Sequence, residues 1–181
     1  MRAALVLLSG GLDSAVCAHL LKCQDFDVRA LFIDYGQAAA CREQASAAAL
    51  AQALNIPLTV QTIAPSPARG AGELLGRNAL LISLGVFAIA SDGGIVVIGV
   101  HAGTPYYDCS EPFIGAMDQL VQEQTDSRVA VSAPLASWTK ADVYRAFQAT
   151  GLPVAATYSC EAGDVPCGEC LSCLDRKKLG C

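Results

Sequence analysis

The chain has 181 residues, of which 53% are hydrophobic and 16% are charged, and its formal net charge is −5. This length suits one domain with a sizeable core. The acidic balance argues against a nucleic-acid-binding protein, because that binding depends on Lys and Arg. The only basic cluster is Arg176, Lys177 and Lys178, which we interpret as the solvated face of a C-terminal helix. The mean hydropathy of +0.41 is high for a small monomer, so we expect a homodimer or a partner complex.

No segment of the sequence resembles a targeting signal or a membrane span. The apolar run at residues 3–8 is too short for a signal-peptide core and leads into a glycine turn. The longest apolar stretch, residues 79–90, has about a dozen residues, whereas a bilayer-spanning helix needs ~20. We therefore expect a cytoplasmic protein with no membrane contact.

Short apolar runs alternate with longer helical patterns, which is typical of a parallel sheet covered by helices. Strands are predicted at residues 3–8, 28–33, 58–63, 95–100 and 129–131. Helices are predicted at residues 13–21, 38–54, 79–90 (mostly buried), 113–124 and 139–148, with a short basic helix near the C-terminus. Residues 64–76 contain prolines and glycines and are expected to form a loop. The predicted fold class is α/β, with a doubly wound, mostly parallel sheet.

The turn after the first predicted strand has the sequence Ser9, Gly10, Gly11, Leu12, Asp13, Ser14. Adjacent glycines let the backbone turn sharply against an anion, and the following helix directs free N–H groups at that anion. Ser9 and Ser14 add hydroxyl donors, and Asp13 can hold Mg²⁺. A plain strand-to-helix turn is the alternative. The turn lacks the lysine of a Walker A loop; it is similar to the SGGxDS motif of PP-loop pyrophosphatases, which bind ATP.

Four of the nine cysteines are crowded near the C-terminus: Cys160, Cys167, Cys170 and Cys173. Their spacing, C-x6-C-x2-C-x2-C, allows four thiolates to converge on one ion and to complete a tetrahedron, which is typical of a structural zinc site. A four-thiolate iron–sulfur cluster is the alternative that the spacing leaves open. We expect the scattered Cys17, Cys23, Cys41 and Cys109 to be small buried hydrophobic residues.

Several segments together resemble one family, the 7-cyano-7-deazaguanine synthases (QueC type) of queuosine biosynthesis. These segments are the phosphate loop, the cysteine knuckle, FIDYGQ at 32–37, GRN at 76–78, Gly99, YDC at 107–109, EPF at 111–113 and WTKAD at 138–142. The resemblance implies a PP-loop ATP-binding α/β domain at residues 1–155. Residues 156–181 would be a zinc-binding knuckle with a short helix, packed on that domain.

The resemblance also implies a reaction: 7-carboxy-7-deazaguanine is adenylated with ATP, converted with ammonia to the amide, and dehydrated to the nitrile. Two ATP would give two AMP and two pyrophosphate.

Residue types and positions predict roles for individual side chains. Asp13, Arg77 and Lys140 are the expected catalytic residues; a lysine at a helix start is disfavoured by the helix dipole, which suggests that Lys140 binds phosphate. Residues expected to bind the nucleotide are Leu8, Ser9, Gly10, Gly11, Leu12, Asp13, Ser14, Ala15, Asp34 and Asn78, with Asp34 at a strand end. Residues expected to bind the deazapurine are Tyr107, Asp108, Glu111 and Phe113; carboxylates accept N–H donors and Tyr107 can stack. Core packing is the alternative for Tyr107, and a loop cap is the alternative for Asp34.

The sequence departs from the family pattern in three places. Ala38, Ala39 and Ala40 stand where the family has Arg-His and polar residues, Ser110 replaces an arginine, and the loop at 64–76 is much shorter. An alternative function therefore keeps the acyl-adenylate but transfers it to a protein amine, as a QueC-like member of an antiphage defence system. The acidic pI of about 4.9 disfavours an RNA-modifying PP-loop enzyme. The intact SGGLDS motif disfavours a non-enzymatic partner subunit.

Overall fold

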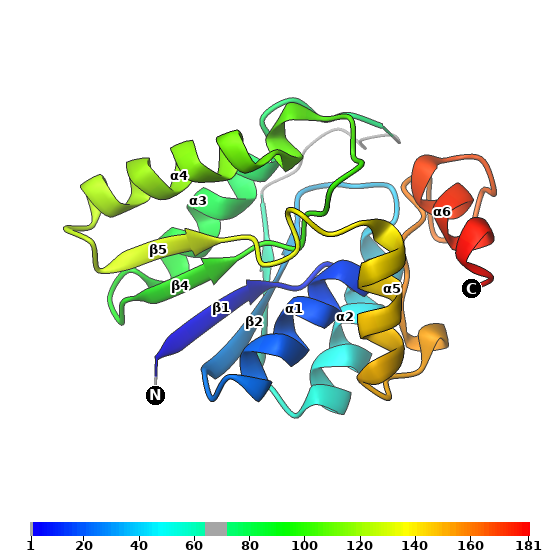
Figure 1. Ribbon diagram of the computed structural model, residues 1–181, viewed down its shortest axis with the longest axis horizontal. Coiled ribbons are helices and arrows are strands. Elements are labelled where there is room, and N and C mark those ends of the chain that lie inside the picture. The colour runs from blue at the N-terminus through cyan, green and yellow to red at the C-terminus, as the bar shows by residue number, and fades with distance from the viewer. Residues whose placement is uncertain (1, 64–71) are drawn as a thin grey trace.

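The computed structural model describes residues 2–63 and 72–181 (Figure 1). Within these residues five strands form one sheet in the order β3-β2-β1-β4-β5, and every neighbouring pair is parallel. The strands are β1 (Ala3–Leu7), β2 (Asp27–Asp34), β3 (Leu58–Thr62), β4 (Gly94–Val97) and β5 (Val129–Ser132). Because all strands run the same way, their carboxyl ends meet at one edge of the sheet.

Helices cover both faces of the sheet (Figure 1). On one face lie α1 (Leu12–Cys23), α2 (Ala40–Leu54) and α5 (Lys140–Ala149), and on the other lie α3 (Arg77–Ile89) and α4 (Glu111–Gln124). The last helix, α6 (Leu171–Leu179), stands beside the carboxyl edge. Two short 3-10 helices, η1 (Tyr107–Cys109) and η2 (Val154–Ala156), complete the described elements. The predicted doubly wound parallel α/β fold is confirmed.

Alternation along the strands divides the interior into two cores. In β1, Ala4 and Val6 point toward α1, α2 and α5, whereas Leu5 and Leu7 point toward α3 and α4. The central strand is therefore apolar on both faces, which explains its uninterrupted hydrophobic run.

Local signals fix several helix ends. Thr139 caps α5: its hydroxyl accepts the Asp142 N–H at 3.2 Å, and the Asp142 carboxylate accepts the Thr139 N–H at 3.1 Å. This reciprocal capping box follows the sequence prediction. At the C-terminal end of α2, Asn55 adopts a left-handed conformation, which ends the helix before β3.

Three expectations need correction or qualification. Helix α3 is not mostly buried, because it lies on one sheet face only and leaves Phe87 82% exposed. Cys23 and Cys41 are exposed, while Cys17 and Cys109 are buried as expected. Residues 64–71 of the predicted loop lie outside the described residues.

Within the described chain, none of the helices has both the length and the apolar character needed to cross a bilayer. The expected cytoplasmic location and the expected dimer or partner complex stay predictions.

Gly99 provides a test of the packing at the carboxyl edge. A Cβ at this position would lie 2.8 Å from the Ser14 amide nitrogen and 2.9 Å from the Asp13 carbonyl carbon, both backbone atoms. We expect Gly99→Ala to lower the free energy of unfolding by about 1–3 kcal/mol, as overpacking does. Gly115→Ala in the exposed part of α4 meets no atom within 4 Å, so it should raise stability by about 0.5–1 kcal/mol. Urea unfolding of both variants measures this, and equal effects would contradict the packing argument.

Candidate active site and metal centre

The phosphate loop lies where the strand order reverses between β1 and β4, the usual ligand site of an open α/β sheet. Gly10 has a φ of +85°, and a Cβ there would lie 2.6 Å from the Glu43 carbonyl oxygen. Only glycine satisfies both conditions, because its backbone adopts positive φ freely and leaves room for α2. Ser14 donates a hydrogen bond to the Gly11 carbonyl at 3.2 Å, and its Oγ lies 3.3 Å from that of Ser9.

An ion pair joins two of the residues that the sequence singles out separately. Lys140 Nζ lies 2.6 Å from Asp13 Oδ2, and both side chains are about one-fifth exposed. Asp13 Oδ1 is buried and has no hydrogen-bond partner among the described residues. A buried carboxylate oxygen without a donor indicates a place for a cation or another donor. The N-termini of α1 and α5 therefore meet at this ion pair.

A cavity of about 400 Å³ opens in front of this pair. Its walls come from the exits of β1, β2 and β4, from α2, α3 and α5, and from the segment around α6. The polar groups include Ser9, Asp13, Ser14, Tyr35, Gln37, Glu43, Arg77, Asn78, Tyr106, Lys140, Ser159, Glu161, Ser172, Asp175 and Lys178. This size is typical of a small-molecule site, and the many polar groups suit a polar or charged ligand.

The predicted nucleotide-binding and catalytic residues divide into three groups. Leu8, Ser9, Gly11, Asp13, Ser14, Arg77, Asn78 and Lys140 line the cavity. Gly10, Leu12 and Ala15 are buried beneath the loop and support it. Asp34 does not line the cavity; its Oδ1 accepts the Gly36 N–H at 3.0 Å, which is the loop-cap arrangement.

The four residues predicted to contact the deazapurine lie outside the cavity lining. Tyr107 is 66% exposed, and its ring meets Phe113 edge-on at 5.9 Å. Asp108 accepts the Asn78 backbone N–H at 3.3 Å, and the Asn78 amide donates to the Asp108 carbonyl at 2.9 Å. Asp108 thus joins η1 to the start of α3, and Glu111 lies in the exposed first turn of α4. A substrate role for these four residues stays a prediction, and the placement favours structural roles for Tyr107, Asp108 and Phe113.

The cavity also contains side chains that the predicted site did not include. Glu43 accepts a hydrogen bond from Gln37 Nε2 at 2.9 Å. Burial raises its pKa from 4.5 to about 7, although Gln37 and the Arg77 charge lower it and Glu161 adds to the rise. Burial also raises the pKa of Tyr35, although Arg77 lowers it. No sequence spacing marks Glu43, because it becomes a cavity residue only when α2 packs against Gly10.

Cys109 lines the same cavity, but its chemistry argues against a nucleophilic role. Burial raises the pKa of the Cys109 thiol to about 11, and the Asp108 charge adds to the effect. Because the thiolate is the reactive form, this cysteine stays protonated at neutral pH.

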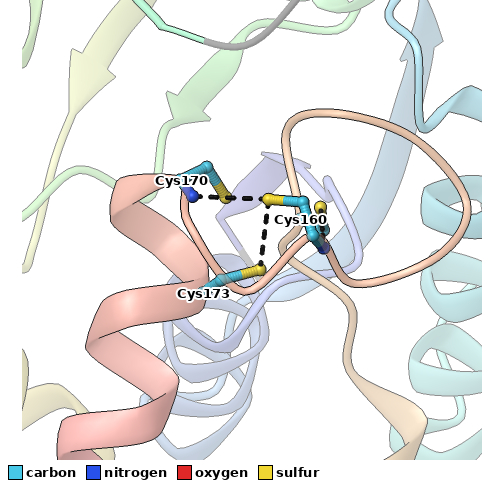
Figure 2. A group of neighbouring side chains, drawn as sticks. Cys160, Cys170 and Cys173 are labelled. Atoms are coloured by element: carbon cyan, nitrogen blue, oxygen red, sulfur yellow. Dashed lines mark hydrogen bonds between the residues drawn. The ribbon is translucent and has the colours of Figure 1, made fainter.

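The four predicted metal ligands come together at the start of α6 (Figure 2). Their sulfur atoms all lie within 4.8 Å of one another; around a tetrahedral zinc with bonds of about 2.3 Å they would be about 3.8 Å apart. Backbone N–H groups of Cys167 and Cys170 donate to Cys160 Sγ and Cys167 Sγ, each at 3.3 Å. Burial raises the pKa of Cys160, but N–H donors from Ala162 and Cys167 more than offset this and lower it to about 6. The donor set therefore fits zinc.

The knuckle packs directly against the phosphate loop. The Tyr158 N–H donates to the Gly10 carbonyl at 2.8 Å. Ala39, from the altered segment before α2, is buried against Tyr158, Cys160 and Cys173. The position of the knuckle is therefore tied to that of the phosphate loop, which lines the cavity.

Arg176 corrects one sequence interpretation. Its guanidinium donates to Thr157 Oγ1 at 3.0 Å and to Ser159 Oγ at 3.1 Å. It ties α6 to the chain before the knuckle instead of forming a solvated basic face. Lys177 and Lys178 are exposed, in agreement with the prediction.

With this geometry in view, comparison with known proteins identifies the family. The model of the family described as "Queuosine biosynthesis protein QueC" matches residues 3–68 and 74–179. The chain belongs to the QueC family. The 7-cyano-7-deazaguanine synthase of Methanothermobacter thermautotrophicus is 35% identical over 206 positions, which cover 97% of this chain and 92% of that protein. The synthase of Synechococcus sp. strain RCC307 is 34% identical, with 93% and 90% covered.

Two details of these matches locate the departure from other QueC proteins. The alignment with the Methanothermobacter synthase is longer than the 181-residue chain, so that relative has residues that this chain lacks. The family match is interrupted at residues 69–73, between β3 and α3.

Among solved structures, NMN synthetase from Francisella tularensis is similar in fold, with a TM-score of 0.61 at 17% identity over 99% of this chain and 72% of that chain.

The knuckle predicts a measurable metal dependence. We expect purified protein to contain about one zinc per chain. A site with four thiolate ligands and no open coordination position couples metal binding to folding. Chelation, or Cys170→Ala, should lower the melting temperature and loosen the C-terminal segment, while Cys23→Ala on the surface should have little effect. Metal analysis and hydrogen exchange measure this. Absence of zinc, or iron with a visible chromophore, would contradict the assignment.

Glu43 predicts a pH-dependent stability. A carboxyl whose folded pKa is raised stabilises the folded state only while protonated, so its contribution is lost as pH rises through about 7. The free energy of unfolding of Glu43→Gln minus that of the wild type should therefore be larger at about pH 8.5 than at about pH 6. Glu123→Gln is the matched control, because exposed Glu123 also accepts one glutamine amide at 2.9 Å. Thermal unfolding that shows no pH-dependent difference between the two variants would count against the raised pKa.

Proposed function

We propose that this QueC-family chain is an ATP-dependent carbon–nitrogen ligase. It adenylates 7-carboxy-7-deazaguanine and converts it with ammonia, through the amide, to 7-cyano-7-deazaguanine. The observation that supports this most directly is the Asp13–Lys140 pair at the phosphate loop, in a cavity of about 400 Å³. The names of its relatives give the product, 7-cyano-7-deazaguanine, and the groups at the phosphate loop are of the kinds that bind phosphate oxygens.

The chain's own groups divide the work on ATP. The N–H groups at the start of α1 and the hydroxyls of Ser9 and Ser14 bind phosphate oxygens. Asp13, with its partnerless Oδ1, is the residue that would hold Mg²⁺, which when bound neutralises phosphate charge. Lys140 then faces the phosphates, and Arg77 lines the opposite wall. These cations stabilise the charge that develops on the departing pyrophosphate.

The chemistry proceeds through two activations. A substrate carboxylate oxygen attacks the α-phosphorus, and pyrophosphate leaves with the bond electrons. The amine nitrogen then attacks the acyl carbon, the C–N bond forms, and AMP leaves with the C–O electron pair. In the second round the amide oxygen attacks a new ATP, and loss of AMP with that oxygen and two protons from nitrogen gives the nitrile. Two ATP therefore yield two AMP and two pyrophosphate.

A second function differs only in the acceptor. The same acyl-adenylate would pass to a protein amine and form a stable deazaguanine–protein amide, as in an antiphage defence system. Two observations favour this alternative. The chain lacks residues that the Methanothermobacter synthase has, and the family match is interrupted between β3 and α3. Ser110, at the position of the family arginine, only caps α4 by accepting the Phe113 N–H at 3.3 Å.

An assay of the separate steps tests the proposal. Protein with ATP, Mg²⁺ and 7-carboxy-7-deazaguanine should release pyrophosphate and form an adenylate detectable by mass, and added ammonia should give amide or nitrile. Asp13→Asn should lower pyrophosphate release at least about a hundredfold, because it removes a charge that positions both Mg²⁺ and Lys140. Asp92→Asn is the control, because it breaks the exposed Arg29–Asp92 ion pair outside the cavity lining.

Each outcome has a definite meaning. A base-labelled protein amine with no ammonia product would favour the alternative function. No stimulation of pyrophosphate release by the acid would contradict both functions.

A further inference from the structure

Adenylation as described leaves several ionisable groups in the cavity without a role, and among them Glu43 is the one whose helix packs against Gly10. Glu43 lies in the first turn of α2, and one oxygen of its carboxylate accepts Gln37 Nε2 at 2.9 Å. The Gln37 amide cannot turn around, because its Oε1 already accepts the Tyr35 N–H at 2.9 Å. Among the described residues the other Glu43 oxygen has no hydrogen-bond partner, and it belongs to a side chain that lines the cavity. Glu43 therefore presents a fixed, free acceptor to a bound molecule.

The position of Glu43 relates it to the reacting centre. Its backbone packs against Gly10 so closely that a Cβ on Gly10 would lie 2.6 Å from the Glu43 carbonyl. Under the proposed function the AMP phosphate of the acyl-adenylate lies at this loop, and the acyl carbon is one oxygen away from that phosphate. The Glu43 side chain lines the cavity in front of this loop, so its carboxylate is suited to act on the atom that attacks the acyl carbon.

Burial and the charges around Glu43 together set its proton affinity. Gln37 and Tyr35 face it from the β2 exit, Arg77 faces it from α3, and Glu161 and Asp164 face it from the knuckle segment. Burial is the largest effect, and it places the pKa of Glu43 at about 7. A general base works best with a pKa near the operating pH.

We propose that Glu43 is the general base of the amide-forming step and accepts a proton from the attacking amine. The proposal rests on the proposed function and extends it. The neutral amine attacks the acyl carbon, the C–N bond forms and one nitrogen proton passes to the Glu43 carboxylate. AMP leaves with the electron pair of the broken C–O bond. The same step serves ammonia or a protein amine, so Glu43 acts in either of the proposed functions.

A purely structural role is the competing explanation. An acidic residue in the first turn favours a helix N-terminus, and Glu43 also holds Gln37. A structural loss would disturb the loop at Gly10 and would therefore lower adenylation and amide formation together. A lost base would lower amide formation alone.

The test measures the two half-reactions separately in the full-length, zinc-loaded protein. Adenylate is first formed from 7-carboxy-7-deazaguanine and ATP without an amine. It is then chased with ammonia or with hydroxylamine, so that a readout exists even if the natural acceptor is a protein. Rates are compared across pH at equal concentrations of unprotonated amine. The variants are Glu43→Gln, Glu43→Asp, which keeps a carboxylate, and the matched control Glu123→Gln.

We expect Glu43→Gln to form adenylate within about threefold of the wild-type rate but to slow the amide step about 10²–10⁴-fold, the usual contribution of a general base. The wild-type amide rate should rise with pH through about 7 and then level off, and this rise should be absent from Glu43→Gln. If Glu43→Gln fails to fold, Glu43→Asp should show the same selective loss and keep a pH dependence.

Equal losses in both steps, or an unchanged amide step, would overturn the role of Glu43 while leaving the proposed function intact. If the wild type forms no adenylate, the proposed function and this inference are both wrong.

Discussion

The close contact between Gly10 and the α2 backbone is the constraint on which the rest of the site depends. It places the Glu43 carbonyl where any side chain on residue 10 would stand. The Gly10 carbonyl accepts the Tyr158 N–H, so three distant parts of the chain meet at Gly10. Because these contacts involve backbone atoms, they cannot adjust by a change of rotamer. The phosphate loop, α2 and the zinc knuckle therefore take up their positions together.

This convergence explains which features could be predicted from sequence. The sheet, the phosphate loop, the α5 capping box and the cysteine cluster each depend on neighbouring residues or on a short periodic pattern, so local signals suffice. Glu43 and Glu161 enter the site only through tertiary packing, and no spacing marks them. Tyr107, Asp108 and Phe113 show the opposite case. They follow a strand exit, as ligand-binding residues often do, but η1 turns them toward α3 and α4.

Electrostatics give two groups in the cavity different properties. Asp13 and Lys140 form an ion pair at the starts of α1 and α5. Under the proposed function Lys140 would bind phosphate oxygens and Asp13 would bind Mg²⁺, so the two side chains would separate. Glu43 lies in a buried setting, where a carboxylate is costly and a proton is easily gained. The ion pair therefore suits charge stabilisation, whereas Glu43 suits proton transfer.

Under the proposed function the cysteine knuckle bears on the choice of acceptor. Its segment contributes Glu161 and Ser172 to the cavity wall, and the Ser172 hydroxyl donates to the Glu161 carboxylate at 2.7 Å. The segment before α2 that departs from the family pattern packs into the same unit through Ala39. This departure therefore lies where the knuckle meets α2, whereas Asp13 and Lys140 lie at the starts of α1 and α5. If adenylation proceeds as proposed, a chain that changes this wall and keeps the phosphate loop retains adenylation while altering which amine reaches the acyl carbon.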